Sequence, residues 1–446
     1  MTPPTRTRLL ALACAGSLLA WAVVPAAATA QAAAVPAQAA VVPAQAAVVP
    51  AQAAAAPAVG PAVAAGRAAL GVPAAQPVTI DDRGSIVTAT LLARRSSKQV
   101  ARYLARAGLP VPARPQGADL YAVVHRTLAV DGTPTTASGV VALPHRSRKH
   151  LWTVTYEHGT LATKADAPSM DEGDGRAVPL MFAAAGFAGV APDYLGLGKG
   201  PGYHPYLDAA TEASASADLL RAATELAGRQ GRALSGDLLV TGFSQGGHAA
   251  MALARSLRDD DTWRVRAVAP VSGPYRLRTA EMPALLGGRL DPSIAAFYLA
   301  YWTVSTNRLH RLYDSPGEVF RRPAVERLFD GAHSFRQITA ELPRTPRELA
   351  TPAYLKRLAA PSGPLLEALE ANDGTCAGWR PGVPVHLYGA HGDKEVAFAN
   401  SRQCLGQLRA AGVKATLTDV GDVPHMATPH RALPEVFRWF TRIRGA

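Results

Sequence analysis

Short apolar segments alternate with longer helical ones through the middle of the chain, and this alternation restricts the fold more than any other feature. Apolar, strand-like segments occur at 120–124, 139–143, 151–156, 187–191, 237–241 and 265–269. Among the later strands, helical segments are expected at about 178–186, 208–228 and 245–257. A strand–helix–strand unit within one sheet forms a right-handed crossover between parallel strands. We therefore expect an α/β fold, with a mostly parallel sheet and helices on both faces.

The alternation stops between residues 274 and 380. This segment has helical stretches, prolines and aromatic residues but no convincing strand, and the alternation resumes at 383–388 and ends with 416–418. A helical insertion between late strands is expected to lie over the carboxyl edge of the sheet, where open α/β sheets bind ligands. Residues 77–446 are therefore predicted to form one domain, with a helical cap or lid at about 274–380.

Residues 1–76 differ in composition from the rest of the chain. Within 1–30, two arginines precede an apolar run at 9–24, and the small residues at 28–30 fit a cleavage site, which is the layout of a secretory signal peptide. At 31–76 a VPAQAAV repeat spaces its prolines regularly, which excludes a coiled coil and predicts an Ala/Pro-rich linker. We expect a secreted protein whose linker is either a tether through a cell-wall layer or a spacer without a role of its own.

The formal net charge of +12 arises from 46 Lys and Arg against 34 Asp and Glu. These basic residues are scattered, with one dense block at 146–150, whereas a nucleic-acid footprint is clustered and interleaved with aromatic residues. We therefore expect no nucleic-acid partner. A mild attraction to anionic lipid or cell-wall surfaces is expected, and the protein is predicted to be a monomer.

Two cysteines, Cys376 and Cys404, lie outside the predicted signal peptide. An even pair in an oxidising compartment predicts one disulfide, and two buried free thiols are the alternative. The acidic run at 259–261 lacks the spaced oxygen ligands of a calcium site, so no metal is expected.

A G-x-S-x-G pentapeptide at 242–246 has Ser244 at its centre. This motif places a nucleophilic serine on a sharp strand-to-helix turn, where glycines permit the turn and close packing around it. The context fits, because a strand precedes the motif and a helix rich in small residues follows. Ser244 is therefore predicted to be a nucleophile rather than a helix-capping serine.

A nucleophilic serine needs a base, and the base needs an orienting acid. On this kind of fold the acid and then the histidine follow the serine along the chain. His425 lies in the loop after the last strand and is favoured as the base over His430, which begins the final helix. Asp393 lies just beyond the strand that follows the insertion and is favoured as the acid over Glu395 and Asp422.

The reaction also needs hydrogen-bond donors for a developing oxyanion. One is expected to be the backbone N–H of Gln245, at the start of a helix. The second is expected in the loop after the third strand, from Gly159 or Thr160, and both stay open. His158 and His248 are interpreted as structural residues.

These motifs together resemble the secretory lipase group of secreted α/β-hydrolases. The resemblance covers about residues 115–440 and rests on YEHGT, the segment 191–198, His204-Pro205-Tyr206, GFSQGG, HGDKEV and the final histidine, His425. It implies a triad of Ser244, Asp393 and His425, a helical lid, and hydrolysis of carboxylic esters, often acylglycerols.

Four aromatic residues in the insertion fall at helical spacing and are candidates for an acyl-binding surface. They are Phe297, Tyr298, Tyr301 and Trp302. Packing within the insertion is the alternative, because an apolar stripe at this period commonly faces a core.

The sequence as a whole predicts a secreted serine hydrolase, a lipase or esterase acting on small-molecule or lipid esters without metal or organic cofactor. An aminopeptidase on the same scaffold is one alternative, and it would need an acidic pair of which Glu157 is one candidate. An acyltransferase and a non-catalytic cell-surface binding protein are the others.

Overall fold

The computed structural model describes residues 82–146, 150–380 and 382–445. The predicted signal peptide (1–30) and linker (31–76), and the domain boundary at residue 77, lie outside these described residues and stay predictions.

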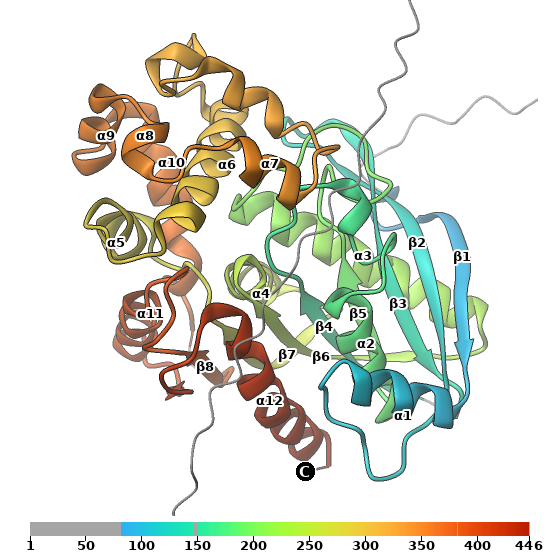
Figure 1. Cartoon of the computed structure of the whole chain (residues 1–446). Helices are drawn as coiled ribbons and strands as arrows, with labels where there is room; N and C mark the ends of the chain where they lie inside the picture. Colours follow the sequence, from blue (N-terminus) through green and yellow to red (C-terminus); the bar gives the residue numbers. More distant parts are fainter. Residues whose placement is uncertain (1–81, 147–149, 381, 446) are drawn as a thin grey trace, which may run out of the picture. The chain divides into compact units, whose positions relative to one another are not determined.

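A nine-stranded sheet forms the centre of the described domain, in the order β1-β2-β3-β5-β4-β6-β7-β8-β9 (Figure 1). Its first four strands in this order pair antiparallel, and from β5 onward every pair is parallel. The prediction of a mostly parallel α/β sheet is confirmed. The strands are β1 (Ile86–Arg95), β2 (Ala118–Leu128), β3 (Pro134–Pro144), β4 (Leu151–Glu157), β5 (Ala188–Pro192), β6 (Leu234–Phe243), β7 (Arg264–Val271), β8 (Val385–Gly389) and β9 (Ala415–Asp419).

Side chains along the central strands alternate between two hydrophobic cores. In β6, Leu238 and Val240 belong to one cluster and Leu239 to another, because successive strand residues point to opposite faces of a sheet. Both faces are buried, which explains the continuous apolar runs of these strands.

Helices cover both faces of this sheet. The first core includes residues of α3, α4 and α11, and the second includes residues of α1, α2 and α12. These helices are α1 (Ser97–Arg106), α2 (Asp174–Ala184), α3 (Ala209–Arg229), α4 (Gln245–Ser256), α11 (Ala399–Ala410) and α12 (Thr428–Gly445).

Strand β1 and helix α1 were not predicted from the sequence. Strand β1 lies at the edge of the sheet, and among its ten residues only Ile86 is buried. An edge strand has one neighbour and few buried residues, so its hydrophobic pattern is weak.

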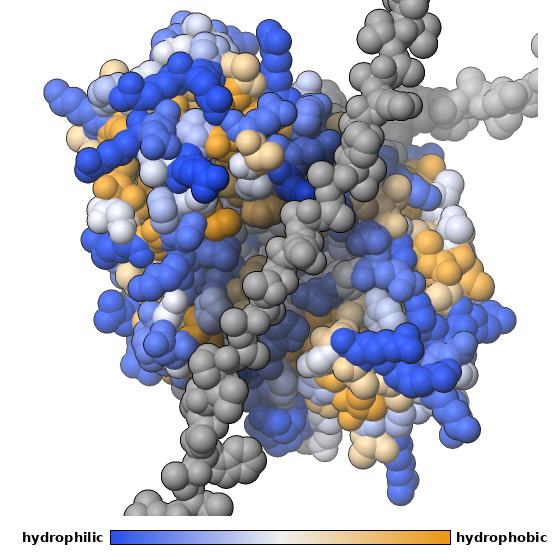
Figure 2. Space-filling model, in the orientation of Figure 1, coloured by the Kyte–Doolittle hydropathy of each residue, from blue (hydrophilic) through white to orange (hydrophobic). Residues whose placement is uncertain are grey.

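Between β7 and β8 the described chain is mainly helical, with one isolated bridge between Phe320 and Ala350. Its helices gather beside the sheet around a third hydrophobic core, and Figure 2 shows mainly hydrophilic residues on their visible face (Figures 1 and 2). The segment begins with a π-helix at Leu277–Glu281, followed by α5 (Met282–Leu286), α6 (Pro292–His310), α7 (Phe335–Glu341), α8 (Pro346–Leu349), α9 (Pro352–Ala359) and α10 (Gly363–Asp373).

A disulfide joins Cys376, just after α10, to Cys404 in α11. Both cysteines are fully buried. The bridge therefore links the end of the helical segment to the sheet domain.

Within the described part of the chain, no helix combines the length and apolarity needed to cross a bilayer. The same residues contain no group of three or more His, Cys, Asp or Glu side chains arranged to hold a metal ion.

Candidate active site

Ser244 lies on the turn between β6 and α4, with φ 58° and ψ −122°. A residue other than glycine rarely adopts a positive φ, and such strain is typical of functional turns. Gly242 and Gly246 permit this turn, because a Cβ on Gly242 would meet the Gly246 carbonyl, and one on Gly246 would meet the Glu157 carbonyl. The local sequence thus places the serine hydroxyl beyond the carboxyl end of β6.

This turn lies where the strand order of the sheet reverses. The chain passes from β4 to β5 on one side and then to β6 on the other, so β4 lies between β5 and β6. Open α/β sheets bind ligands at such a point, outside the carboxyl ends of the strands. The loop that follows β4 contains Gly159, and a methyl group at this position would lie 3.6 Å from Ser244 Cβ.

Ser244, His425 and Asp393 form one hydrogen-bonded chain. The Ser244 hydroxyl lies 2.9 Å from His425 Nε2, and His425 Nδ1 lies 2.6 Å from Asp393 Oδ2. The exposed fractions are 4% for the serine, 1% for the histidine and 6% for the aspartate, so water competes little for these contacts. In this arrangement the imidazole can accept the serine proton while the carboxylate holds the other ring N–H.

The loop after β8 holds the Asp393 carboxylate in place. Its second oxygen, Oδ1, accepts hydrogen bonds from the backbone N–H groups of Glu395 (2.9 Å) and Val396 (3.0 Å). The two alternative carboxyl groups lie elsewhere: Glu395 accepts a hydrogen bond from the Tyr298 hydroxyl at 3.0 Å, and Asp422 is exposed. His430 is exposed as well.

The predicted oxyanion donors lie around the serine. Gln245 is the first residue of α4, where backbone N–H groups have no partner within the helix. Gly159 and Thr160 line the same cavity as Ser244, and the Thr160 hydroxyl lies 2.9 Å from the Tyr206 hydroxyl. Both stay candidates for the second donor.

Two cavities meet at Ser244. One, of about 300 Å³, is also lined by Gly159, Thr160 and His425. The other is narrow, about 40 Å³, and almost entirely apolar. Tyr298 lines both cavities and therefore lies between them.

The four aromatic residues predicted to contact substrate separate into two groups. Tyr298 and Trp302 line the narrow cavity. Phe297 and Tyr301 line neither cavity, because α6 turns them into the core of the helical segment, where both rings contact Phe329.

Sequence reasoning did not find the apolar residues just after β7 that line the narrow cavity. Leu277, Met282 and Leu285 come from the π-helix and α5, and Glu281 is the one carboxylate among the described lining residues. Their apolar positions recur at helical spacing shortly after β7, with polar residues between them, and this pattern is the signal that could have identified them.

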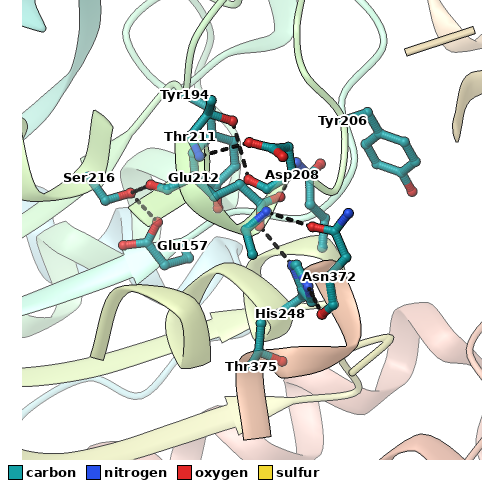
Figure 3. Close-up of polar contacts among 12 residues, drawn as sticks. Glu157, Tyr194, Tyr206, Asp208, Thr211, Glu212, Ser216, His248, Asn372 and Thr375 are labelled. Atoms are coloured by element: carbon teal, nitrogen blue, oxygen red, sulfur yellow. Dashed lines mark hydrogen bonds and ion pairs between the residues drawn. The ribbon is translucent and has the colours of Figure 1, made fainter. Parts of the chain in front are cut away.

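Glu157, the candidate for binding a substrate amine, is the last residue of β4 and is fully buried. Its backbone carbonyl lies against Gly246, and Figure 3 shows its side chain beside Ser216. Its carboxyl group contacts the hydroxyls of Thr155 (2.8 Å) and Ser216 (2.9 Å), and Ser216 Oγ also lies 2.7 Å from the Glu212 carbonyl. Ser216 has a single hydroxyl proton for these two acceptors, and a protonated Glu157 that donates to Ser216 satisfies both contacts. Burial of the carboxyl group also favours its protonated form, because it raises the pKa of Glu157 to about 8.

Replacing Glu157 with glutamine should stabilise the protein increasingly as pH rises. The native protein keeps a proton on Glu157 up to about pH 8, whereas an unfolded glutamate releases it near 4.5, so wild-type stability falls with pH across this window. Glutamine offers the same hydrogen bonds without ionising. We expect the Tm of Glu157→Gln relative to wild type to increase between about pH 5 and pH 8 and then to level off. A Tm difference between Glu157→Gln and wild type that does not change with pH would contradict a protonated Glu157 in the native protein.

No protein-family model matches the chain, and no curated protein matches its sequence. The chain is, however, similar to several solved structures. A candidate hydrolase from Legionella pneumophila is 28% identical, with a TM-score of 0.74, over 80% of this chain and 98% of that one. The rice cell wall degrading esterase LipA from Xanthomonas oryzae is 27% identical, with a TM-score of 0.70, over 81% and 96% of the two chains.

Candida antarctica lipase A, at 15% identity and a TM-score of 0.55 over 77% of this chain and 78% of that one, shares the fold. The protein therefore has the α/β-hydrolase fold. Its structural neighbours at 27–28% identity support a hydrolase of the lipase and esterase kind.

Proposed function

We propose that this protein is a secreted serine hydrolase that cleaves carboxylic esters through a covalent acyl-enzyme. The observation that carries the proposal is the buried hydrogen-bonded chain of Ser244, His425 and Asp393, which opens onto two cavities.

In the proposed reaction, His425 takes the proton of the Ser244 hydroxyl as its oxygen attacks the ester carbonyl. The Gln245 N–H and a second N–H from Gly159 or Thr160 stabilise the oxyanion. His425 then gives the proton to the leaving alcohol. Water, deprotonated by the same histidine, releases the acid and regenerates the serine.

The two cavities favour neutral ester substrates with an apolar acyl group. The narrow cavity presents an apolar lining to an acyl chain. The wider cavity is lined by three aspartates without a lysine or arginine among its described lining residues, which disfavours substrates whose alcohol part carries a negatively charged group. The aspartates are Asp166, Asp171 and Asp174.

Export is supported by the signal-peptide pattern at 1–30 and by the disulfide, since disulfides persist in oxidising compartments. We propose a secreted protein on these two grounds. In this proposal the segment between β7 and β8 acts as a lid, because its π-helix and helices α5 and α6 line the narrow cavity.

An aminopeptidase that binds the substrate amine with Glu157 is less well supported. Glu157 is fully buried, and neither it nor the equally buried Glu212 lines a cavity at Ser244. A substrate amine bound at Ser244 would therefore not reach this acidic pair.

A fluorophosphonate probe is expected to label the protein on Ser244. The protein is also expected to hydrolyse p-nitrophenyl esters but not matched aminoacyl anilides. An activated serine reacts with such probes because it is deprotonated during attack. Peptide mass spectrometry locates the label, and heat-unfolded protein serves as control. Absence of labelling would point to a non-catalytic binding protein, and hydrolysis confined to anilides would point to a peptidase.

A further inference from the structure

A buried polar network lies behind the first turn of α4, and the proposed reaction does not use it directly (Figure 3). Glu212 of α3 is 1% exposed and His248 of α4 is fully buried. His248 Nδ1 lies 2.8 Å from Glu212 Oε2, and His248 Nε2 lies 3.1 Å from the backbone carbonyl of Asn372 in α10. The network thus joins three helices that are distant in the sequence.

The hydrogen-bond partners define the protonation states of this pair. Both ring nitrogens of His248 face acceptors, and a neutral imidazole can donate from only one nitrogen, so both bonds form when the ring is protonated. Burial lowers the pKa of His248, but the charge of Glu212 and its hydrogen bond outweigh burial and raise the pKa overall. Glu212 and His248 therefore form a buried ion pair.

The second oxygen of Glu212 holds the side chain of Gln245. Gln245 Nε2 donates to Glu212 Oε1 at 2.8 Å and lies 2.8 Å from His204 Nε2. His204 Nδ1 lies 3.0 Å from the Leu195 carbonyl, so its Nδ1 carries the proton and its Nε2 accepts from Gln245. Both N–H bonds of the amide are then used, and the side chain is held in one orientation.

Gln245 is also the residue whose backbone N–H is the proposed oxyanion donor. We propose that Glu212 is a positioning residue for this site: paired with His248, it holds the Gln245 side chain and through it the first turn of α4, so that the Gln245 N–H points at the forming oxyanion. This inference rests on the proposed function, because it assigns a role within the same reaction.

The structure offers a matched control for a merely structural role. Asp218 lies on the same helix, is also fully buried, and binds Arg83, Arg221 and Thr127 rather than Gln245. Its removal also deletes a buried carboxylate of α3, but it leaves the contacts of Gln245 in place.

The experiment compares Glu212→Leu, Glu212→Gln and Asp218→Leu with wild type. We expect Glu212→Leu to lower kcat about 10- to 100-fold with KM changed less than about threefold, because a displaced oxyanion donor acts on the transition state. Glu212→Gln should restore kcat to within about threefold of wild type, since its amide oxygen accepts from Gln245 and its NH₂ donates to a neutral His248. Asp218→Leu should lower Tm and leave kcat within about threefold.

Hydrogen exchange of a peptide spanning 243–249 gives a readout that does not depend on catalysis. Glu212→Leu should speed exchange at this turn at least about threefold, and Asp218→Leu should not. If Glu212→Leu does not fold, Gln245→Leu replaces it, because this variant removes the side-chain amide and keeps the backbone N–H. It should show the same loss of kcat and the same faster exchange at this turn.

Wild-type exchange in Glu212→Leu, or equal losses of kcat in Glu212→Leu and Asp218→Leu, would overturn the positioning role. A wild-type protein that neither hydrolyses esters nor reacts with fluorophosphonate would refute the proposed function instead. In that case the exchange experiment alone decides whether Glu212 holds the turn.

Discussion

Replacing Ser244 with alanine is expected to lower kcat for p-nitrophenyl ester hydrolysis by about 10⁴- to 10⁶-fold. The alanine has no oxygen to form the acyl-enzyme, and only the oxyanion donors and substrate binding would then contribute to the rate. The measurement is the initial rate on a short-chain ester, with wild-type and variant protein prepared in parallel.

The variant should also fold normally. The strained backbone of Ser244, at φ 58°, is imposed by the surrounding turn, and alanine has a similar conformational cost there. An unchanged Tm together with loss of fluorophosphonate labelling would show that the effect is chemical. Substantial hydrolysis by the folded alanine variant would overturn the proposed function.

Replacing Asp393 with asparagine is expected to lower kcat by about 10³- to 10⁴-fold. Asp393 Oδ2 accepts the His425 Nδ1–H at 2.6 Å, and this bond leaves Nε2 free to accept the serine proton. An asparagine amide that donates to Nδ1 would move the ring proton to Nε2, where it blocks attack. The pH dependence of kcat and the Tm are measured together.

Asp422→Asn provides the control for this variant. Asp422 lies three positions before His425 in the chain but is exposed, and it makes no hydrogen bond to that histidine among the described contacts. We expect its kcat to stay within about threefold of wild type. A large loss in Asp422→Asn with little loss in Asp393→Asn would reverse the assignment of the acid.

Prediction from the sequence worked best where one local segment carries the information. The strand, the pentapeptide at 242–246 and the following small-residue helix lie side by side in the chain, so the serine turn could be recognised without any tertiary knowledge. The Ser244–His425 contact spans 181 positions and the His425–Asp393 contact spans 32, but chain order on this fold narrowed the choice of base and acid.

The aromatic residues of α6 show that helical periodicity does not predict which residues face the site. Helical spacing places Phe297, Tyr298, Tyr301 and Trp302 on neighbouring parts of one helix, yet only Tyr298 and Trp302 line a cavity at Ser244. Spacing alone cannot distinguish the residues that line the cavity from those in the helical core. A helix that packs against other helices on one side and against the site on another has apolar residues on both sides.

The amino-acid sequence alone was enough for the mostly parallel sheet apart from its edge strand β1, for the serine turn and for the order of the proposed triad, because each depends on neighbouring residues or on chain order. Folding decided the rest: which aromatic residues reach the serine, why Glu157 keeps its proton, and how Glu212 meets both His248 and Gln245. The contacts of Glu212 with Gln245 and His248 join positions 33 and 36 residues apart, and their energies depend on burial. A buried charge is stable only beside its partner, and tertiary packing alone brings such partners together.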